Sequence, residues 1–263
     1  MLPHCSLVHG NCMRARKIAQ QLKSSDFDLI VFEEAFDTRA RGILYRNLKK
    51  SFPYMYGPAN MPLFSLRTNS GVWVISKIPL KKVDQIEYKN RVGIDAMARK
   101  GAVLFEGNWN DQIFQLACTH LQADSPDSIR RAQCKEFATR LLLKNAKEAV
   151  PQIVCGDFNI ENDDIENYQY MLHSLDVENG IIDGDIKTSF DEVDNLLAKR
   201  INGKKQMIDY VLIRNTQFVH FIKRKISVLR SSDHNRIIDL SDHYGVEAIF
   251  EFSINNNRIS LNN

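Results

Sequence analysis

Short apolar runs that end in carboxylate, amide or imidazole side chains recur along this chain. One such run, DFDLIVFEEAF, leads from Asp26 into Glu33 and Glu34, and the run QIFQLACTH ends at His120. A third run, QIVCGDFN, closes on a Gly-Asp-Phe-Asn turn. Continuous apolar runs of this length between turn signals are typical of buried strands. Because strand ends are where rigid scaffolds present reactive side chains, the pattern predicts a β-rich protein with chemistry at its strand ends.

Helical periodicity separates these strand-like runs. The segments RARKIAQQL and SIRRAQCKEFATRLLLK each gather their apolar residues on one face, which predicts two amphipathic helices. The stretch 161–206 is polar and acidic, and we expect mostly loops there, with one short helix near 168–175. Further strands are predicted at 71–77, 101–107, 207–213, 218–222, 225–229 and 245–252. With no repeat and no linker, this layout indicates one domain of two packed sheets covered by helices over residues 1–254, followed by a polar tail at 255–263.

Composition excludes several classes of protein. The 263 residues carry 35 Lys and Arg against 32 Asp and Glu, a net charge of +3 that is too mild for an extended nucleic-acid footprint. Five cysteines without CxxC spacing predict reduced, mostly buried thiols rather than disulfides or a zinc site. No apolar run approaches the ~18 residues of a transmembrane helix. The first residues lack the apolar segment of a signal peptide, so we expect a cytoplasmic protein, or a secreted one if a leader preceded Met1.

The polar residues at the strand ends form a candidate metal site. They are Glu34, His120, Asp157, Asn159, Asp209, Asp242 and His243. Residues two apart on a strand face the same way, so Asp157 and Asn159 are expected to address one ligand. Carboxylate and amide oxygens favour Mg²⁺ or Ca²⁺ over zinc. With so few protein oxygens, Mg²⁺ would keep waters and bind a substrate phosphate directly.

The tripeptide Ser-Asp-His occurs twice, at 232–234 and at 241–243, and an Asp-His pair can prepare an imidazole as a general base. The second copy runs into the alternating strand YGVEAIFEF, which would anchor it in the core. We therefore interpret His243 as catalytic, and His234 as a surface residue of a connecting loop. The remaining histidines away from the strand ends are interpreted as structural, namely His4, His9, His173 and His220.

The order of these residues resembles the endonuclease/exonuclease/phosphatase superfamily of metal-dependent phosphoesterases over nearly the whole chain. Longer stretches are similar to the neutral sphingomyelinases, especially the secreted bacterial type. The segments that carry the likeness are FEEAFD, LYRNLKKSFP, GVWVISKIPL, RKGAVLF, THLQAD, SIRRAQ, GDFNI, the weaker TSFDEVDNLLA, IDYVL and SDHYGV. The resemblance implies an α+β fold, a four-layer α/β/β/α sandwich in which two packed, mainly antiparallel sheets are flanked by helices.

The resemblance also implies an activity. It predicts a Mg²⁺-dependent phosphodiesterase of the phospholipase C type, a monomer that cleaves sphingomyelin to ceramide and phosphocholine at a membrane surface. Glu34 is implied as the ligand of Mg²⁺, with Asp242 supporting the metal side. His243 is implied as the base that activates water for in-line attack, and Asp209 as the residue that orients it.

Three further residues receive roles from the same resemblance. Asp157 and Asn159 would hold the attacking water and the phosphate. His120 would bind the substrate, stabilise the developing charge or assist the leaving group. A phosphodiester needs charge neutralised on its non-bridging oxygens and a proton removed from water, so these roles are also chemically reasonable without the family.

This chain departs from the family pattern at three places. Relatives carry a first strand that ends in a metal-binding Asn, whereas this chain starts at the Met-Leu-Pro segment that follows it, and Asn11 is a poor substitute. We therefore expect the first strand to be missing, and the chain to be less stable and weakly active. Glu33 stands where relatives have Asn or Gln. The hairpin before the second Asp-His lacks Trp and Phe, so Ile237, Ile238 and Leu240 would give only a weaker apolar contact with a membrane.

Two other functions stay open. A nuclease that acts on DNA or abasic sites would share every strand-end residue, although the ~6 to 10 phosphate contacts of such an enzyme normally need a basic groove. An inositol polyphosphate phosphatase is disfavoured because KKQMIDYVL replaces that branch's Pro-Ala-Trp-type segment. A catalytically impaired member kept as a binding module is supported by the missing Asn, and opposed by the survival of the other strand-end residues.

Overall fold

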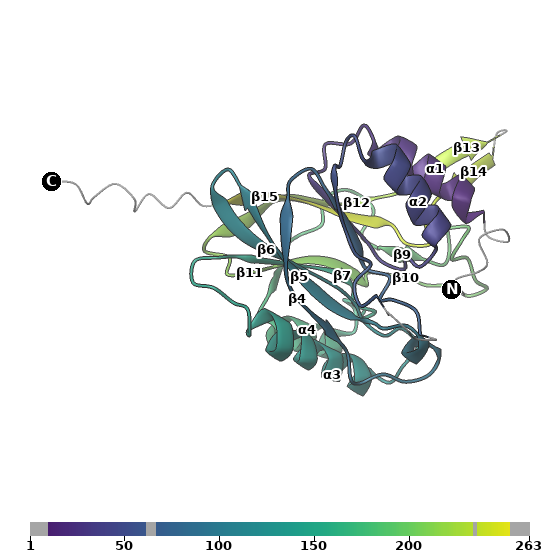
Figure 1. Ribbon diagram of the computed structural model, residues 1–263. Coiled ribbons are helices and arrows are strands. Elements are labelled where there is room, and N and C mark those ends of the chain that lie inside the picture. Colours follow the sequence, from purple (N-terminus) through teal and green to yellow (C-terminus); the bar gives the residue numbers. More distant parts are fainter. Residues whose placement is uncertain (1–9, 62–66, 234–235, 253–263) are drawn as a thin grey trace.

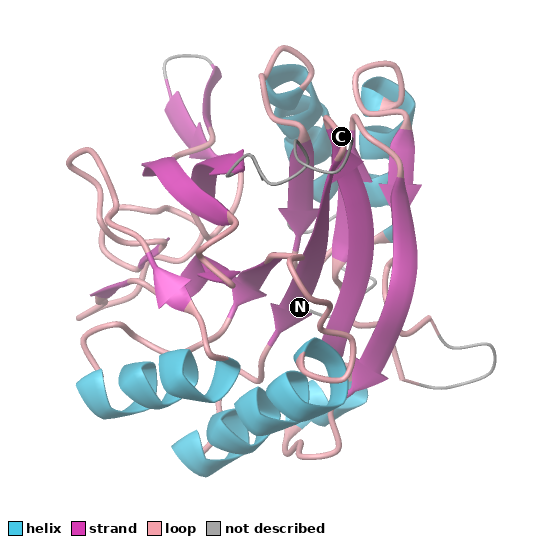
Figure 2. Cartoon of the chain, turned by 90° about the vertical axis from the view of Figure 1, so that its left-hand side faces the viewer, coloured by secondary structure: helices cyan, strands magenta, loops and turns pink. Residues whose placement is uncertain are grey.

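The computed structural model describes residues 10–61, 67–233 and 236–252, and these form four layers (Figure 1). The helices are α1 (Asn11–Leu22), α2 (Thr38–Leu48), α3 (Asp127–Phe137) and α4 (Ile165–Leu175), with a 3-10 turn η1 (Ile94–Met97) and a π-helical turn η2 (Ala138–Leu142). Helices α1 and α2 lie on one side of the strands and α3 and α4 on the other, as Figure 2 also shows. The predicted four-layer α/β/β/α sandwich is confirmed.

The central layer is a six-stranded sheet in the order β4-β5-β6-β7-β11-β8. Its strands are β4 (Leu80–Glu87), β5 (Gly101–Trp109), β6 (Gln112–His120), β7 (Gln152–Asp157), β8 (Glu178–Asn179) and β11 (Asp209–Arg214). Every neighbouring pair is antiparallel except β6 and β7, which run parallel. The parallel pair places the carboxyl ends of β6 and β7 at the same edge, next to the amino end of β11.

The second sheet layer consists of two smaller sheets. One has the order β1-β3-β2, with β1 (Leu29–Phe32), β2 (Tyr54–Tyr56) and β3 (Trp73–Ser76), and the other pairs β12 (Val219–Ser227) with β15 (Gly245–Phe252). Both lie on the same face of the six-stranded sheet, because Val31 from β1 and Phe250 from β15 pack against one buried cluster with Phe105 and Leu116 of the central sheet. Two short hairpins complete the strands, formed by β9 (Phe190–Asp191) with β10 (Lys205–Gln206) and by β13 (Arg230–Asp233) with β14 (Arg236–Asp239).

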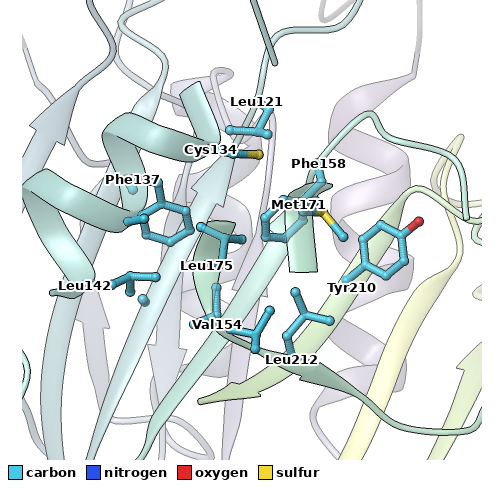
Figure 3. Packing of buried hydrophobic residues seen from close by; sticks show 14 of the residues in the cluster. Leu121, Cys134, Phe137, Leu142, Val154, Phe158, Met171, Leu175, Tyr210 and Leu212 are labelled. Carbon is cyan, nitrogen blue, oxygen red and sulfur yellow. The ribbon is translucent and has the colours of Figure 1, made fainter. Parts of the chain in front are cut away.

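The two outer cores attach the helices. On one side Phe137 of α3 and Met171 of α4 pack onto Val154 and Leu212 of the central sheet, as Figure 3 shows. On the other side Ala15, Ala19 and Leu22 of α1 and Leu48 of α2 meet Trp73 and Ile75 of β3. Together with the core between the two sheets, these make three layers of buried aliphatic and aromatic side chains. The hydrophobic effect therefore fixes the order of the layers.

A tight approach between β6 and β7 prepares the edge that carries the polar residues. Gly156 has φ +142°, and a Cβ atom there would lie 1.9 Å from the carbonyl oxygen of Thr119. Only glycine therefore allows β7 to lie this close to β6 one residue before Asp157.

The loop that follows β1 is also held in place. The side chain of Asp37 caps α2 by accepting hydrogen bonds from the backbone N–H groups of Arg39 at 2.8 Å and Ala40 at 3.2 Å. The guanidinium of Arg41 donates to the carbonyl of Ala35. Such a cap is worth ~1 kcal/mol. It fixes the direction in which the chain leaves β1 after Glu33.

Most predicted elements are confirmed, and the differences have simple causes. The runs predicted as strands at 218–222 and 225–229 form mainly one strand, β12, because a register irregularity between Phe221 and Lys223 keeps both halves paired with β15. The hairpin β13–β14 replaces the expected connecting loop, and His234 lies outside the described residues. The polar stretch 161–206 holds α4 and three short strands as well as loops. The tail at 255–263 also lies outside the described residues.

Two predictions from composition can be compared with the structure. The described cysteines are free thiols; Cys118, Cys134 and Cys155 are buried and Cys12 is partly buried, as expected for reduced thiols. In the described part of the chain, no helix is long and apolar enough to cross a membrane.

Candidate active site

Three strand ends and one loop converge at a single edge of the central sheet. The Cα register pairs His120 at the end of β6 with Asp157 at the end of β7, and pairs Asp157 with Asp209 at the start of β11. His243, in the loop between β14 and β15, forms a β-bridge with Phe190 of β9, and its side chain contacts Asp209. Four of the predicted site residues, far apart in the sequence, therefore lie side by side.

Asp209 and His243 form a hydrogen-bonded dyad. Nδ1 of His243 lies 2.8 Å from Oδ2 of Asp209. Burial lowers the pKa of His243, but the negative charge of Asp209, its hydrogen bond and the charges of Asp157 and Asp242 together raise that pKa to about 11. The Nδ1–H group donates to the carboxylate, so Nε2 is the nitrogen left for chemistry.

Asp157, Asp209 and His243 form the described cluster that could hold a metal ion, with one ligand atom from each all within 4.8 Å of one another. Burial and the neighbouring charge of Asp209 raise the pKa of Asp157 to about 7. Burial, followed by Asp209, Cys155 and Asp157, raises the pKa of Glu33 well above its ordinary value.

The raised pKa values of Asp157 and Glu33 bear on whether the cluster suits a hard cation such as Mg²⁺. Carboxyl groups gathered in a poorly solvated place repel one another when ionised, and a divalent cation bound between them removes that repulsion. The two carboxylates suit such a cation chemically, whereas the imidazole of His243 is the softer donor and stays free to act as a base. A cation bound to Asp157 and Asp209 would also offset the charges that raise the pKa of His243, and so bring it closer to the range of a general base.

His120 occupies the other side of Asp157, and Lys100 holds it there. Nε2 of His120 lies 3.4 Å from Oδ2 of Asp157 and 3.0 Å from Nζ of Lys100. The same ammonium contacts Oδ2 of Asp95 at 2.8 Å and donates to the carbonyl of Leu121 at 2.9 Å. Burial, then the charge of Lys100, lowers the pKa of His120 well below its ordinary value, so this imidazole is neutral.

The tautomer of His120 follows from these contacts. An ammonium can only donate, so Nε2 of His120 accepts from Lys100 and the ring proton is on Nδ1. That Nδ1 is buried and has no hydrogen-bond partner among the described residues. A buried N–H without a partner is costly, which makes it a donor available to a phosphate oxygen or a water.

Sequence reasoning missed the residues that assemble the dyad. The hydroxyl of Ser189 accepts hydrogen bonds from the backbone N–H groups of Ile208 at 3.1 Å and Asp209 at 3.0 Å, and its carbonyl accepts from the N–H of Tyr244 at 2.6 Å. One fully buried serine thus ties Asp209 to the chain on the far side of His243. Its segment, TSFDEVDNLLA, is only a weak part of the family resemblance.

Two further residues of that segment support the histidine. The ring of Phe190 lies 4.7 Å from the ring of His243, centroid to centroid. The side-chain amide of Asn195 donates to the carbonyls of Ser241 at 2.8 Å and Asp242 at 3.1 Å. The aromatic contact and the two hydrogen bonds restrict the loop that carries His243. No local pattern in the sequence indicated these contacts.

Asn159 lies beside Asp157 for a different reason from the one expected. Strand β7 ends at Asp157, and Asn159 has a left-handed φ of 52°. Its backbone N–H donates to Oδ1 of Asp157 at 2.8 Å, and its side-chain amide donates to the carbonyl of Leu121 at 3.2 Å. An Asx turn, rather than strand alternation, therefore places Asn159 beside the site.

The two residues predicted to bind the metal, Glu34 and Asp242, are less closely associated with the cluster than Asp157, Asp209 and His243 are with one another. The side chain of Glu34 is exposed and its φ is 50°, whereas it is the partly buried Glu33 whose pKa responds to Asp209 and Asp157. Asp242 is partly buried and acts on His243 through its charge. Metal binding by Glu34 and Asp242 stays a prediction.

Asn11 lies at the start of α1, where its side-chain amide donates to Oδ2 of Asp37 at 3.2 Å. This contact gives Asn11 a structural partner at the N-terminus of α2, so the structure offers no role for it at the metal cluster.

Comparison with known proteins agrees with this architecture. Phospholipase C of Staphylococcus aureus is 27% identical over 222 residues, which cover 77% of this chain and 67% of the relative. Sphingomyelinase C of Bacillus cereus is 27% identical over 274 residues, covering 91% and 82%. Among solved structures, a variant of beta toxin from S. aureus with bound magnesium ions superposes with a TM-score of 0.78 at 24% identity, covering 91% of this chain and 92% of that one. At that identity the superposition shows the fold alone.

The match to a family model assigns the chain to a family. The profile of the Endonuclease/Exonuclease/phosphatase family matches residues 8–243, from the segment before α1 to the histidine of the dyad. Because this match spans most of the sequence, and the four-layer sandwich with its convergent strand ends accompanies it, the chain belongs to the Endonuclease/Exonuclease/phosphatase family.

Proposed function

We propose that this protein is a Mg²⁺-dependent phosphodiesterase of the phospholipase C type that hydrolyses sphingomyelin to ceramide and phosphocholine. The observation that carries the proposal is the Asp209–His243 dyad, held at 2.8 Å beside the buried carboxylate of Asp157. The relatives named phospholipase C and sphingomyelinase C support the substrate class, and the beta toxin that binds magnesium ions supports the metal.

Asp157 and Asp209 would hold Mg²⁺, with Glu34 and Asp242 as further proposed ligands. When bound, the ion supplies Lewis-acid polarisation of a phosphoryl oxygen. Burial and the charge of Asp209 raise the pKa of Asp157 to about 7. Metal binding is therefore expected to release a proton from Asp157 near neutral pH.

His243 would take the proton of the attacking water at Nε2. Asp209 would hold His243 in the Nδ1–H tautomer and stabilise the imidazolium that forms. A general base needs such a partner to fix its orientation and balance its charge. General-base catalysis of this kind contributes roughly 10²- to 10⁴-fold. Ser189 and Asn195 serve this step indirectly, because they hold the two chain segments at the right separation.

His120 and Asn159 would bind the phosphate on the opposite side of Asp157. The neutral imidazole of His120 offers its Nδ1–H, and Lys100 prevents the ring from rotating. Asn159 is held by its own backbone hydrogen bond to Asp157. The phosphate would thus meet fixed donors, which need no reorganisation as charge develops in the transition state.

The test is a panel of phosphodiesters assayed with Mg²⁺ and with EDTA. Sphingomyelin, a lysophospholipid and abasic DNA are offered to the wild type, to His243→Ala and to His220→Ala. His220 is a matched control because it also pairs with a carboxylate, Glu251 at 3.1 Å, but on the surface.

We expect Mg²⁺-dependent cleavage of sphingomyelin by the wild type and by His220→Ala, and a loss of at least about 100-fold in His243→Ala. Cleavage of abasic DNA without cleavage of sphingomyelin would replace the proposed substrate. An unchanged rate in His243→Ala would refute the mechanism.

A further inference from the structure

One arginine links the two loops that carry the proposed metal ligands Glu34 and Asp242. Arg14 lies near the start of α1, and Nη1 of its guanidinium donates to the carbonyl of Leu240 at 3.1 Å. Leu240 is two residues before Asp242 and three before His243. The guanidinium therefore holds the segment of chain that enters the active site from the β13–β14 hairpin.

The other terminal nitrogen of the guanidinium points toward the loop after β1. Nη2 of Arg14 donates to Oδ1 of Asn11 at 2.7 Å, and the side-chain amide of Asn11 donates to Oδ2 of Asp37 at 3.2 Å. Asp37 caps α2 and lies three residues after Glu34. Asn11 is thus a link between the two loops rather than a metal ligand.

Helix α1 provides a rigid base for this link. Arg14, Lys17 and Gln21 follow one another at spacings of three and four residues, so they share one side of the helix. Lys17 donates to the hydroxyl of Ser231 at 2.9 Å and Gln21 donates to the carbonyl of Arg230 at 2.6 Å, both in β13, which lies beside α1 (Figure 1). The apolar face of α1 packs on β3. The helix therefore fixes where the hairpin and the segment after it lie relative to the sheets.

The position of Arg14 is costly, which argues against a purely structural role. Its Nε is buried and has no hydrogen-bond partner among the described residues. A buried donor without a partner costs free energy. Burial lowers the pKa of Arg14, and the negative charge of Asp242 raises it. The guanidinium thus acts on the segment of Asp242 through charge as well as through the backbone of Leu240.

We propose that Arg14 is a positioning residue for the metal site, because it sets the separation between the loop of Glu34 and the loop of Asp242 and His243. The inference rests on the proposed function only in that these two carboxylates are proposed to bind Mg²⁺. The guanidinium is a cation and cannot itself be a ligand. Replacing a residue that holds metal ligands in place typically lowers metal affinity by roughly 10- to 100-fold. A change at Arg14 should therefore act first on Mg²⁺ binding.

The test measures Mg²⁺ binding to the full chain by isothermal titration calorimetry, and then the rate on the water-soluble diester bis(4-nitrophenyl) phosphate over a range of Mg²⁺ concentrations. Arg14→Met keeps the apolar stem of the side chain and removes its charge and both hydrogen bonds. We expect its Kd for Mg²⁺ to rise by at least about tenfold. Its rate should recover at saturating Mg²⁺, because Asp209, Phe190 and Asn195 still hold His243.

The matched control is Arg131→Met, on the helix layer at the other side of the sheets (Figure 1). Arg131 of α3 also donates twice, from Nε to Oδ1 of Asn167 at 2.6 Å and from Nη2 to Oε1 of Glu166 at 2.7 Å, both in α4. Both variants lose two side-chain hydrogen bonds, but only Arg14→Met should weaken Mg²⁺ binding. Equal weakening in both variants would overturn the proposal, since general destabilisation would then explain the loss.

Arg14→Lys separates geometry from charge. Its ammonium keeps the positive charge near Asp242 but lacks the planar fork that donates to Leu240 and Asn11 together. We expect a Kd for Mg²⁺ between those of the wild type and Arg14→Met. A wild-type Kd in Arg14→Lys would show that charge alone matters, and would overturn the positioning role.

Two further outcomes would overturn it as well: a wild type that binds no Mg²⁺, and an Arg14→Met variant that binds Mg²⁺ as the wild type does. The calorimetry keeps this inference separate from the proposed function. If Mg²⁺ binding depends on Arg14 but no diester is cleaved, the proposed function fails and the positioning role stands.

Discussion

Replacing Asp209 by Asn removes one negative charge from the dyad while keeping its shape. The amide oxygen can still accept from Nδ1 of His243, so the ring should keep its orientation. What is lost is the charge of the carboxylate, which lies 2.8 Å from the ring and is the leading cause that raises the pKa of His243 to about 11 against the effect of burial.

The size of the effect follows from the type of interaction. A charge-assisted hydrogen bond contributes about 1.5 to 3 kcal/mol, which corresponds to about one to two pKa units. We therefore expect the pKa of His243 in Asp209→Asn to fall by at least that amount. The same loss in the transition state, where the imidazolium forms, predicts that kcat falls by at least roughly 10- to 150-fold, because Asp209 is also a proposed ligand of Mg²⁺.

Two measurements check this prediction. The pKa is followed by NMR of the histidine ring nitrogens in EDTA, and kcat is measured on bis(4-nitrophenyl) phosphate with Mg²⁺. The matched control is Glu251→Gln, which removes the carboxylate of the surface pair with His220 and should leave His243 unchanged. A His243 that titrates in Asp209→Asn as it does in the wild type would show that the dyad does not control its charge.

Three further predictions concern the carboxylate cluster, its neighbouring histidine and the core. In EDTA, the stability contributed by protonation of Asp157 is fully present below its unfolded pKa of about 3.8 and is lost as the pH rises through about 7, which amounts to up to about 4 kcal/mol. Thermal unfolding should show Mg²⁺ raising the Tm more at pH 8 than at pH 5, and Asp157→Asn should reduce this difference; equal shifts at both pH values would contradict it. Lys100→Met should raise the pKa of His120, since the ammonium lowers it, and an NMR titration unchanged by the substitution would show that Lys100 is not its electrostatic partner. Phe137→Ala should cost about 3 to 5 kcal/mol in urea unfolding because its ring is fully buried, whereas exposed Ile165→Ala should change stability by less than about 0.5 kcal/mol.

Local patterns in the sequence determined the elements and the chemical character of the site. The run that ends at His120 was predicted as a strand and is β6, and the run into Asp157 is β7. Both predictions depend on short-range periodicity, which records how a strand buries its side chains. The resemblance then indicated the family and the dyad partner of His243.

Only the tertiary structure decided how these elements meet. Residues 120 and 157 become register partners because β6 and β7 pair in parallel, a contact between segments far apart in the chain that no local window contains. The same is true of Ser189, whose hydroxyl serves Asp209 while its carbonyl serves Tyr244. A single serine in a polar loop has no periodicity to reveal it.

The two glutamates after β1 show most clearly what the sequence alone could not predict. The sequence places Glu33 and Glu34 together at the end of a strand, and the family pattern selects Glu34. The backbone at Glu34 turns into the left-handed region with φ 50°, so its side chain is exposed while that of Glu33 responds to the charges of the cluster. Which of two adjacent side chains faces inward depends on one backbone angle, and that angle is set by the packing of the surrounding chain rather than by the residues themselves.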